Sequence, residues 1–173
     1  MSRLTSTLLV CLMLALPAGL TAPAVQAADL AAPKGPVVLE LGGTIARRNA
    51  IGLARFDRAM LEAVGMVEIV TTTAWTDGVK RFRGPLVRDV LKAVGADGTS
   101  VTAVALNDYQ VAMPIADFDA YDVILAMEMD GQTMSVRDKG PIWIVWPRDQ
   151  FPELDRPAIN DRWVWQLRSL TVE

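Results

Sequence analysis

The chain has 173 residues, a formal net charge of −3, one cysteine and no histidine. A mildly acidic chain is a poor match for nucleic acid, whose protein partners carry basic surfaces. Without histidine, and with Cys11 as the single thiol, the composition excludes Ser-His-Asp triads, ordinary zinc sites and His- or Cys-ligated haem or iron–sulfur centres.

The first 27 residues have the features of a cleavable export signal. Arg3 provides a positive start, residues 8–16 form a short apolar run, and "VQA" at 25–27 offers small residues for cleavage before Ala28. Cleavage would leave 146 of the 173 residues, remove Cys11, and change the charge from −3 to −4 because Arg3 is lost. We therefore expect a periplasmic protein, without membrane insertion after cleavage, since no later run approaches the ~20 apolar residues of a spanning helix.

A second interpretation of the same segment is a lipoprotein cleavage box, "LLVC" at residues 8–11. Val10 is bulky for that position, and apolar sequence continues beyond Cys11. We therefore prefer the cleavable signal over the lipid anchor.

The first half of the mature chain predicts alternating strands and helices. Residues 28–35 form a flexible lead, and residues 36–173 form one domain. Strands are expected over 36–45 and over the β-branched stretch 66–75. Between them a helix is expected, with Leu53, Phe56, Met60, Leu61 and Val64 as its apolar positions and Gly65 as its end. A second helix should begin at Pro85 and end at Gly95, with a stripe of Leu86, Val90, Leu91 and Val94.

The second half predicts mostly β-structure. Strands over 100–106 and 110–115 flank the turn "NDY", and strands over 122–129 and 132–137 flank the hairpin signal Asp130-Gly131. Two final strands cover 141–147 and 162–172. Within them Trp143 and Trp146 should face opposite sides, whereas residues 163 and 165, both tryptophan, should face the same side as core. The fold class is α+β, a mixed β-sheet or flattened barrel with two main helices on its side.

Three ordered stretches resemble a known family: "FRGPLVRDVLKAVG" from Phe82, "NDYQVAMPIAD" from Asn107 and "MDGQTMSVRDKGPIWIVWP" from Met129, followed by "RWVWQL". Together they resemble the molybdopterin-binding domain of the sulfite oxidase superfamily in its stand-alone periplasmic form. The resemblance covers residues 36–173 and implies a sulfite-oxidase molybdopterin-domain-like fold.

The chain departs from that family at the metal. In catalytic members a cysteine that ligates molybdenum ends the strand before the "F-x-G" helix, which places the position among Thr71, Thr72 and Thr73. Threonine supplies no soft thiolate ligand. The resemblance therefore implies a site for a free pterin, with no molybdenum expected, and favours a binding protein over an enzyme.

Cysteine-free members of this kind include the PruR-like pterin-binding regulators, which this chain resembles in length, signal peptide and the "NDY" and "RDKGP" stretches. That resemblance implies signalling of ligand occupancy to the periplasmic domain of an inner-membrane protein that makes or degrades cyclic di-GMP. Two alternatives stay open: a molybdopterin-dependent oxidoreductase without a protein thiolate, and an accessory protein whose former pocket is filled.

The stretch "AWTDGVKRFRG" is our first candidate for ligand contacts, because a pterin needs a ring for stacking, an acceptor for its amino edge and donors for its carbonyl. Trp75 would stack, Asp77 would accept, and Lys80, Arg81 and Arg83 would donate just ahead of a helix N-terminus. Core packing for the tryptophan and a solvated surface for the charges are the competing interpretations.

Two further stretches supply candidates. Asn107, Asp108 and Tyr109 offer polar edges and a ring, although Asn-Asp is also ordinary turn chemistry. In "RDKGP", Arg137 and Lys139 precede a Gly-Pro pair that permits close backbone approach, although such a loop is commonly solvated. Trp143 is a candidate wall of the pocket, with core packing as the alternative.

Overall fold

The computed structural model describes residues 30–173. The predicted signal peptide, residues 1–27, and Cys11 lie outside the described residues. Within residues 30–173 no helix has both the length and the apolar character needed to cross a bilayer.

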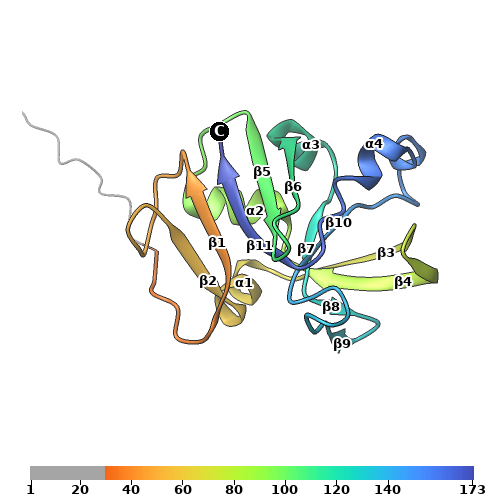
Figure 1. Ribbon diagram of the computed structural model, residues 1–173, viewed down its shortest axis with the longest axis horizontal. Coiled ribbons are helices and arrows are strands. Elements are labelled where there is room, and N and C mark those ends of the chain that lie inside the picture. Colours follow the sequence, from red (N-terminus) through yellow and green to blue (C-terminus); the bar gives the residue numbers. More distant parts are fainter. Residues whose placement is uncertain (1–29) are drawn as a thin grey trace, which may run out of the picture.

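A mixed five-stranded sheet forms the centre of the molecule (Figure 1). Its order is β2-β1-β11-β5-β6, in which β1 runs parallel to β11 and the other neighbours are antiparallel. Since β2 and β6 remain as edges, the sheet is open and does not close into a barrel. The strands are β1 (Val37–Gly43), β2 (Ala54–Asp57), β5 (Ser100–Ala105), β6 (Gln110–Pro114) and β11 (Leu167–Val172).

A four-stranded antiparallel sheet and a two-stranded ladder lie beside the central sheet. The order β3-β4-β8-β9 includes a long hairpin of β3 and β4 that projects from the body of the molecule (Figure 1). The bounds are β3 (Val67–Thr73), β4 (Thr76–Gly84), β8 (Glu128–Met129) and β9 (Gln132–Thr133), with β7 (Ile124–Ala126) paired to β10 (Trp143–Val145).

Short helices complete the α+β fold that the sequence predicted. The described residues contain α1 (Arg58–Val64), α2 (Val87–Val94), α3 (Ile115–Ala120), α4 (Pro157–Asn160) and a 3₁₀ turn over Pro152–Leu154. The predicted second helix is confirmed as α2, whose buried stripe includes Val90 and Val94 and which ends at Gly95 with φ 62°. The two shortest helices, α3 and α4, were not predicted, because neither has a full helical period of apolar residues.

The predicted first helix starts later than expected. Ala54 and Phe56 are buried while Arg55 between them is exposed, so residues 54–57 alternate with the period of a strand and form β2. Asp57 then caps the helix by accepting the backbone N–H of Met60. The apolar residues whose spacing suggested one long helix therefore lie partly in the strand β2 and partly in the shorter helix α1.

Residues 76–84 are a strand, which corrects the expectation of a loop leading into a helix. Phe82 is buried between exposed Arg81 and Arg83, the alternation of a half-buried strand. At Gly84 a Cβ would lie 1.9 Å from the carbonyl oxygen of Leu125, so the close approach of β7 requires glycine there. The helix begins three residues further on, at Val87.

The last strand is also shorter than predicted. It begins at Leu167, because Gln166 adopts φ 51° and breaks the extended conformation. The segment 162–166 therefore leaves the sheet and packs against the β3–β4 hairpin through its two tryptophans, at positions 163 and 165.

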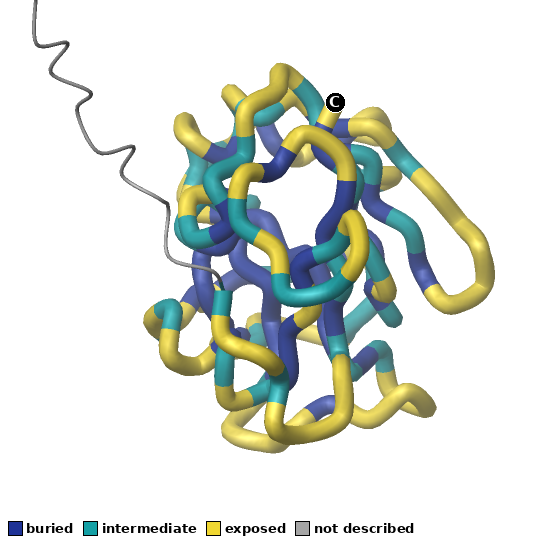
Figure 2. Tube along the Cα trace, turned by 90° about the vertical axis from the view of Figure 1, so that its left-hand side faces the viewer, coloured by how far each residue is buried: buried dark blue, intermediate teal, exposed yellow. Residues whose placement is uncertain are grey.

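The buried core runs through the middle of the molecule, as the dark-blue trace in Figure 2 shows. The prediction that Trp143 and Trp146 face opposite sides is confirmed. Trp143 packs on Phe82 with ring centroids 5.3 Å apart, whereas Trp146 packs on Phe118 at 5.9 Å. Both tryptophans are fully buried, so each anchors one side of the β7–β10 ladder.

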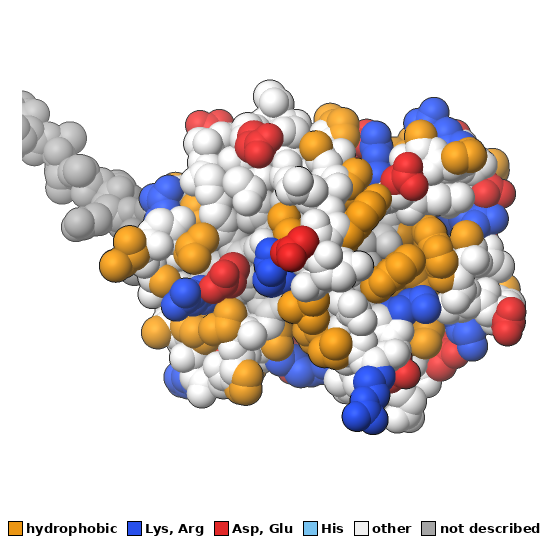
Figure 3. All heavy atoms as spheres, in the orientation of Figure 1, with side chains coloured by type: hydrophobic (Ala, Val, Ile, Leu, Met, Phe, Trp, Pro, Cys, Tyr) orange, Lys and Arg blue, Asp and Glu red, His pale blue; other side chains and the backbone are white. Residues whose placement is uncertain are grey.

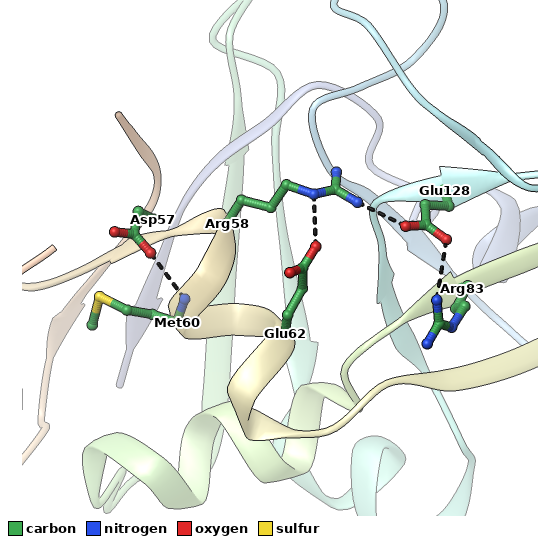
Figure 4. Close-up of polar contacts among 6 residues, drawn as sticks. All are labelled: Asp57, Arg58, Met60, Glu62, Arg83 and Glu128. Carbon is green, nitrogen blue, oxygen red and sulfur yellow. Dashed lines mark hydrogen bonds and ion pairs between the residues drawn. The ribbon is translucent and has the colours of Figure 1, made fainter. Parts of the chain in front are cut away.

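Asp57 ties three chain segments together at the start of α1. Its carboxylate accepts the N–H groups of Lys34 and Gly35, at 2.7 and 2.8 Å, and that of Met60 at 2.9 Å. Figure 4 shows the contact to Met60 beside Arg58, which pairs with Glu62 and Glu128. The N–H groups of Met60 and Gly35, in that order, hold the pKa of Asp57 below its ordinary value of 3.8.

Replacing Asp57 by Asn should lower the melting temperature at neutral pH, because an amide presents its own N–H groups to three backbone donors. A carboxylate with a lowered pKa contributes stability that is present above the ordinary value of 3.8 and is lost as pH falls through its folded-state pKa. Thermal melts from pH 7 to pH 2.5 should therefore show the two proteins converging below about pH 3.8. Asp119→Asn, at an exposed position of α3, is the control, and a gap that stays constant with pH would contradict the role of this charge.

Candidate functional site

A pocket of about 270 Å³ opens where three segments that are far apart in sequence meet. They are the β3–β4 turn, the β5–β6 turn with the end of β5, and the segment that follows α4. Figure 3 shows hydrophobic side chains gathered on this face, between β6 and the β3–β4 hairpin. The lining residues are Trp75, Ala105, Asn107, Tyr109, Asn160, Asp161, Trp163, Val164 and Trp165.

Three indoles form one wall of the pocket. Trp75 lies with its ring centroid 5.4 Å from that of Trp165 and 5.8 Å from that of Trp163, at interplanar angles of 69° and 50°. Behind them the fully buried Trp143 contacts all three rings. Edge-to-face and tilted contacts of this kind add about 0.5–1.5 kcal/mol per pair beyond burial. The wall is therefore a rigid aromatic surface that belongs partly to the core.

Polar residues of the β5–β6 turn and of the segment around Asp161 also line the pocket. The Tyr109 hydroxyl donates to the carbonyl oxygen of Asp161 at 2.8 Å, and Asn107 Oδ1 accepts the Tyr109 N–H at 3.2 Å. Partial burial, followed by the negative charge of Asp161, raises the pKa of Tyr109 above its ordinary value of 10.0. The phenol therefore stays protonated at neutral pH and bridges the β5–β6 turn to the segment after α4.

Three buried polar atoms in this region have no hydrogen-bond partner in residues 30–173: the Nε1 atoms of Trp143 and Trp163 and Oδ1 of Asn160. Buried polar groups are paired in the large majority of cases, so unpaired ones call for a partner outside the protein chain. Trp163 and Asn160 line the pocket, but their unpaired atoms are themselves buried and lie beneath its surface.

The three threonines at the expected metal-ligand position are engaged within the protein. Asp149 accepts both the N–H and the hydroxyl of Thr72, at 2.8 and 2.6 Å, and donates its own N–H to the hydroxyl oxygen of Thr71 at 3.2 Å. The hydroxyl of Thr73 accepts the N–H of Trp75 at 3.0 Å. These contacts fix the end of β3 and orient Trp75.

The donor set does not fit a protein-ligated molybdenum. Threonine hydroxyls are hard, neutral oxygens, whereas the family's metal takes a soft thiolate. Within residues 30–173 no group of three or more His, Cys, Asp or Glu side chains comes together in a way that would hold a metal ion. The lining combines indole rings with polar residues, which are the kinds of group that contact a flat organic ring.

The structure brings several of the sequence candidates to the pocket. Trp75, Asn107 and Tyr109 line it. Trp143 lies behind the indole wall, and the Lys139 ammonium lies 5.5 Å from the ring centroid of Trp143. Asp108 holds the turn with φ 63° and pairs with Arg168 at 3.1 Å, so it lies beside the pocket without lining it.

Other candidates lie elsewhere. Arg81 pairs with Glu68 across the β3–β4 ladder at 2.7 Å. Arg83 points to Glu128, with the charged atoms 3.5 Å apart (Figure 4). Asp77 and Arg137 are exposed and do not line the pocket, and Lys80 pairs with Asp130. Lys80, Arg81 and Arg83 precede α2 as predicted, but on a strand, where each pairs with a carboxylate.

Sequence reasoning assigned Trp163 and Trp165 to the core, yet both line the pocket. Trp163 is nearly fully buried and Trp165 is partly buried, so each serves the core and the pocket together. The spacing of two in "WVW" did place both rings on one side. Asn160 and Asp161 had no signal in the sequence, because their position depends on the unpredicted helix α4.

Comparison with known proteins gives one family and one fold. A family model described as oxidoreductase molybdopterin binding domain matches residues 55–150, which include Trp75, Asn107 and Tyr109. No curated protein matches the chain significantly.

Among solved structures, 28 chains match, one of which is the sulfane dehydrogenase SoxCD from Paracoccus pantotrophus. It is 15% identical, with a TM-score of 0.56, over 78% of this chain and 37% of that chain. At this identity the likeness shows a shared fold, and the chain spans little more than a third of that protein chain.

Asp149→Ala should destabilise the protein by about 1–2 kcal/mol, because it removes the acceptor for two groups of Thr72. Urea unfolding measures this change, and a red shift of tryptophan fluorescence should accompany it as Trp75 loses its fixed position. Asp155→Ala, which removes the exposed partner of a partly buried Arg148, is the matched control and should cost under about 1 kcal/mol. Equal effects of the two variants would show that Asp149 does not anchor the end of β3.

Proposed function

The chain belongs to the oxidoreductase molybdopterin binding domain family, and from that membership we propose that it is a periplasmic, non-enzymatic pterin-binding protein that signals ligand occupancy. The observation that carries the proposal is the pairing of an indole wall with a polar edge, in a chain whose mature part has no cysteine or histidine. The pocket has aromatic and polar residues that can bind a ring, and the mature chain has no cysteine to ligate the family's metal.

The pocket suits the size and chemistry of a single pterin ring. Its volume of about 270 Å³ is close to the lower end of the range of about 300–1,000 Å³ for small-molecule sites. A pterin would stack on the indole wall and donate from its amino edge to an oxygen of Asp161. The buried Trp163 Nε1, which has no partner in the described chain, would donate to the ring carbonyl only after the indole turns toward the pocket.

The charges around the pocket favour a free pterin over molybdopterin, which carries a phosphate. The lining residues include Asp161 but no lysine or arginine. Arg81 and Arg83, which would have served as phosphate partners, pair with glutamates on neighbouring strands. An anionic tail would therefore find no counter-charge in the lining.

The signalling role rests on the resemblance to the PruR-like regulators. In this proposal the occupied protein docks on the periplasmic domain of an inner-membrane protein, such as a cyclic di-GMP synthase or phosphodiesterase. The β3–β4 turn, the β5–β6 turn and the segment after α4 meet at the pocket. A ligand that contacts all three would alter a surface that a receptor can contact.

A molybdopterin-dependent oxidoreductase, or an accessory protein of one, is the alternative that family membership itself favours. The oxidoreductase would require molybdenum held by the cofactor without a protein thiolate, whereas the accessory protein would bind no pterin. Metal analysis of protein purified from the periplasm separates the two proposals, since the alternative enzyme would carry molybdenum in a fixed ratio and reduce a dye acceptor.

Native mass spectrometry of the exported protein should show a chain that begins at Ala28 with a pterin bound and no molybdenum. After the ligand is removed, adding back a reduced pterin should raise the melting temperature, since a ligand that binds the folded state stabilises it. Trp75→Ala should abolish this shift by removing part of the stacking wall. Arg81→Ala should leave the shift intact, because Arg81 lies on the ladder away from the pocket.

Three results would contradict the proposal: no pterin in the native protein and no thermal shift, bound molybdenum, or equal loss of binding in both variants. Circular dichroism shows whether Trp75→Ala still folds. If it does not, Asn107→Ala tests the polar edge of the same pocket, and full binding by that folded variant would likewise count against the assignment.

A further inference from the structure

The pocket has a second property that a pterin does not require: it is rich in electrons and acceptors, with no positive side chain in its lining. We propose that it also binds a small organic ammonium ion. This inference goes beyond the pterin and does not depend on it, because it rests on the charge of the pocket and not on the shape of the ring.

The indole wall provides the attraction. The face of an indole carries negative electrostatic potential, and a cation within about 6 Å of a ring centroid is stabilised by it. Trp75, Trp163 and Trp165 line the pocket at angles of 50–69° for the two pairs that include Trp75. Rings inclined in this way present differently directed surfaces to the pocket, which suits a compact, rounded group.

The same indole cluster already holds an ammonium of the protein. The Lys139 Nζ lies 5.5 Å from the ring centroid of Trp143 and 5.6 Å from that of Trp165. Lys139 does not line the pocket, so the pocket-facing surfaces of the cluster remain available to a ligand. The contact shows that the geometry of these rings is compatible with cation binding.

Oxygen-bearing residues of the lining add to the attraction. Asp161 lines the pocket, and its negative charge lies close enough to act on the Tyr109 hydroxyl. The Tyr109 hydroxyl uses its proton toward the Asp161 carbonyl, so its oxygen lone pairs remain free to accept. These groups would orient an N–H or hydroxyl group attached to the ammonium.

Choline and its neutral isostere 3,3-dimethylbutan-1-ol test the charge directly, because the two molecules share a shape and differ in the quaternary nitrogen. Isothermal titration and tryptophan quenching of the ligand-free protein should show choline binding at least about tenfold more tightly, as a desolvated cation–π contact predicts. Asp161→Asn and Trp75→Ala should each weaken choline binding. Lys139→Met should strengthen it, because it removes a like charge next to Trp165.

Asp108→Asn is the matched control: it removes a carboxylate that lies near the pocket but does not line it, and it should leave choline binding unchanged. Equal affinity for choline and the neutral alcohol, binding of neither, or unchanged binding in folded Asp161→Asn would overturn the inference. Pterin binding is measured on the same samples, so a protein that binds pterin but not choline refutes this inference alone, and the reverse refutes the proposed function alone.

Discussion

The packing of Trp75 against the tryptophans at 163 and 165 is the contact on which the pocket depends. It joins the tip of a projecting hairpin to a segment that lies almost ninety residues later in the chain, and buried Trp143 supports it from behind. The hairpin end is fixed independently, since Thr72 is bonded twice to Asp149. With both anchors in place the aromatic wall is part of the folded core, and a ligand meets a surface that is already formed.

The threonines at the end of β3 belong to the same arrangement. The threonine hydroxyls at the end of β3 bond to Asp149 and to the N–H of Trp75, so the position where catalytic relatives place a ligand has a structural task here. Hydroxyl oxygens serve this purpose well because each donates and accepts at once. The pocket lining offers groups for stacking and for hydrogen bonding.

The sequence predicted the elements that depend on interactions between residues close together in the chain. The helix α2 has an amphipathic stripe and a terminal glycine, and the "NDY" and Asp130-Gly131 turns have the residues that tight turns need. The strand β4 was not predicted because it contains too few apolar residues to show the alternation of a strand. Its extended conformation depends on pairing with β3. The pocket was half predicted for a related reason. Trp75, Asn107 and Tyr109 carry recognisable binding chemistry, whereas Asn160 and Asp161 reach the site only through the long-range packing of the C-terminal segment.

The hydrogen bond between Tyr109 and the Asp161 carbonyl has a kinetic consequence. It is the neutral contact that joins the two polar segments of the rim, and a neutral hydrogen bond contributes about 1 kcal/mol net. A closure that weak breaks and reforms on the nanosecond-to-microsecond timescale of loop motion, without any unfolding of the sheets beneath it. The rim can therefore open for a ligand while the indole wall beneath it stays packed.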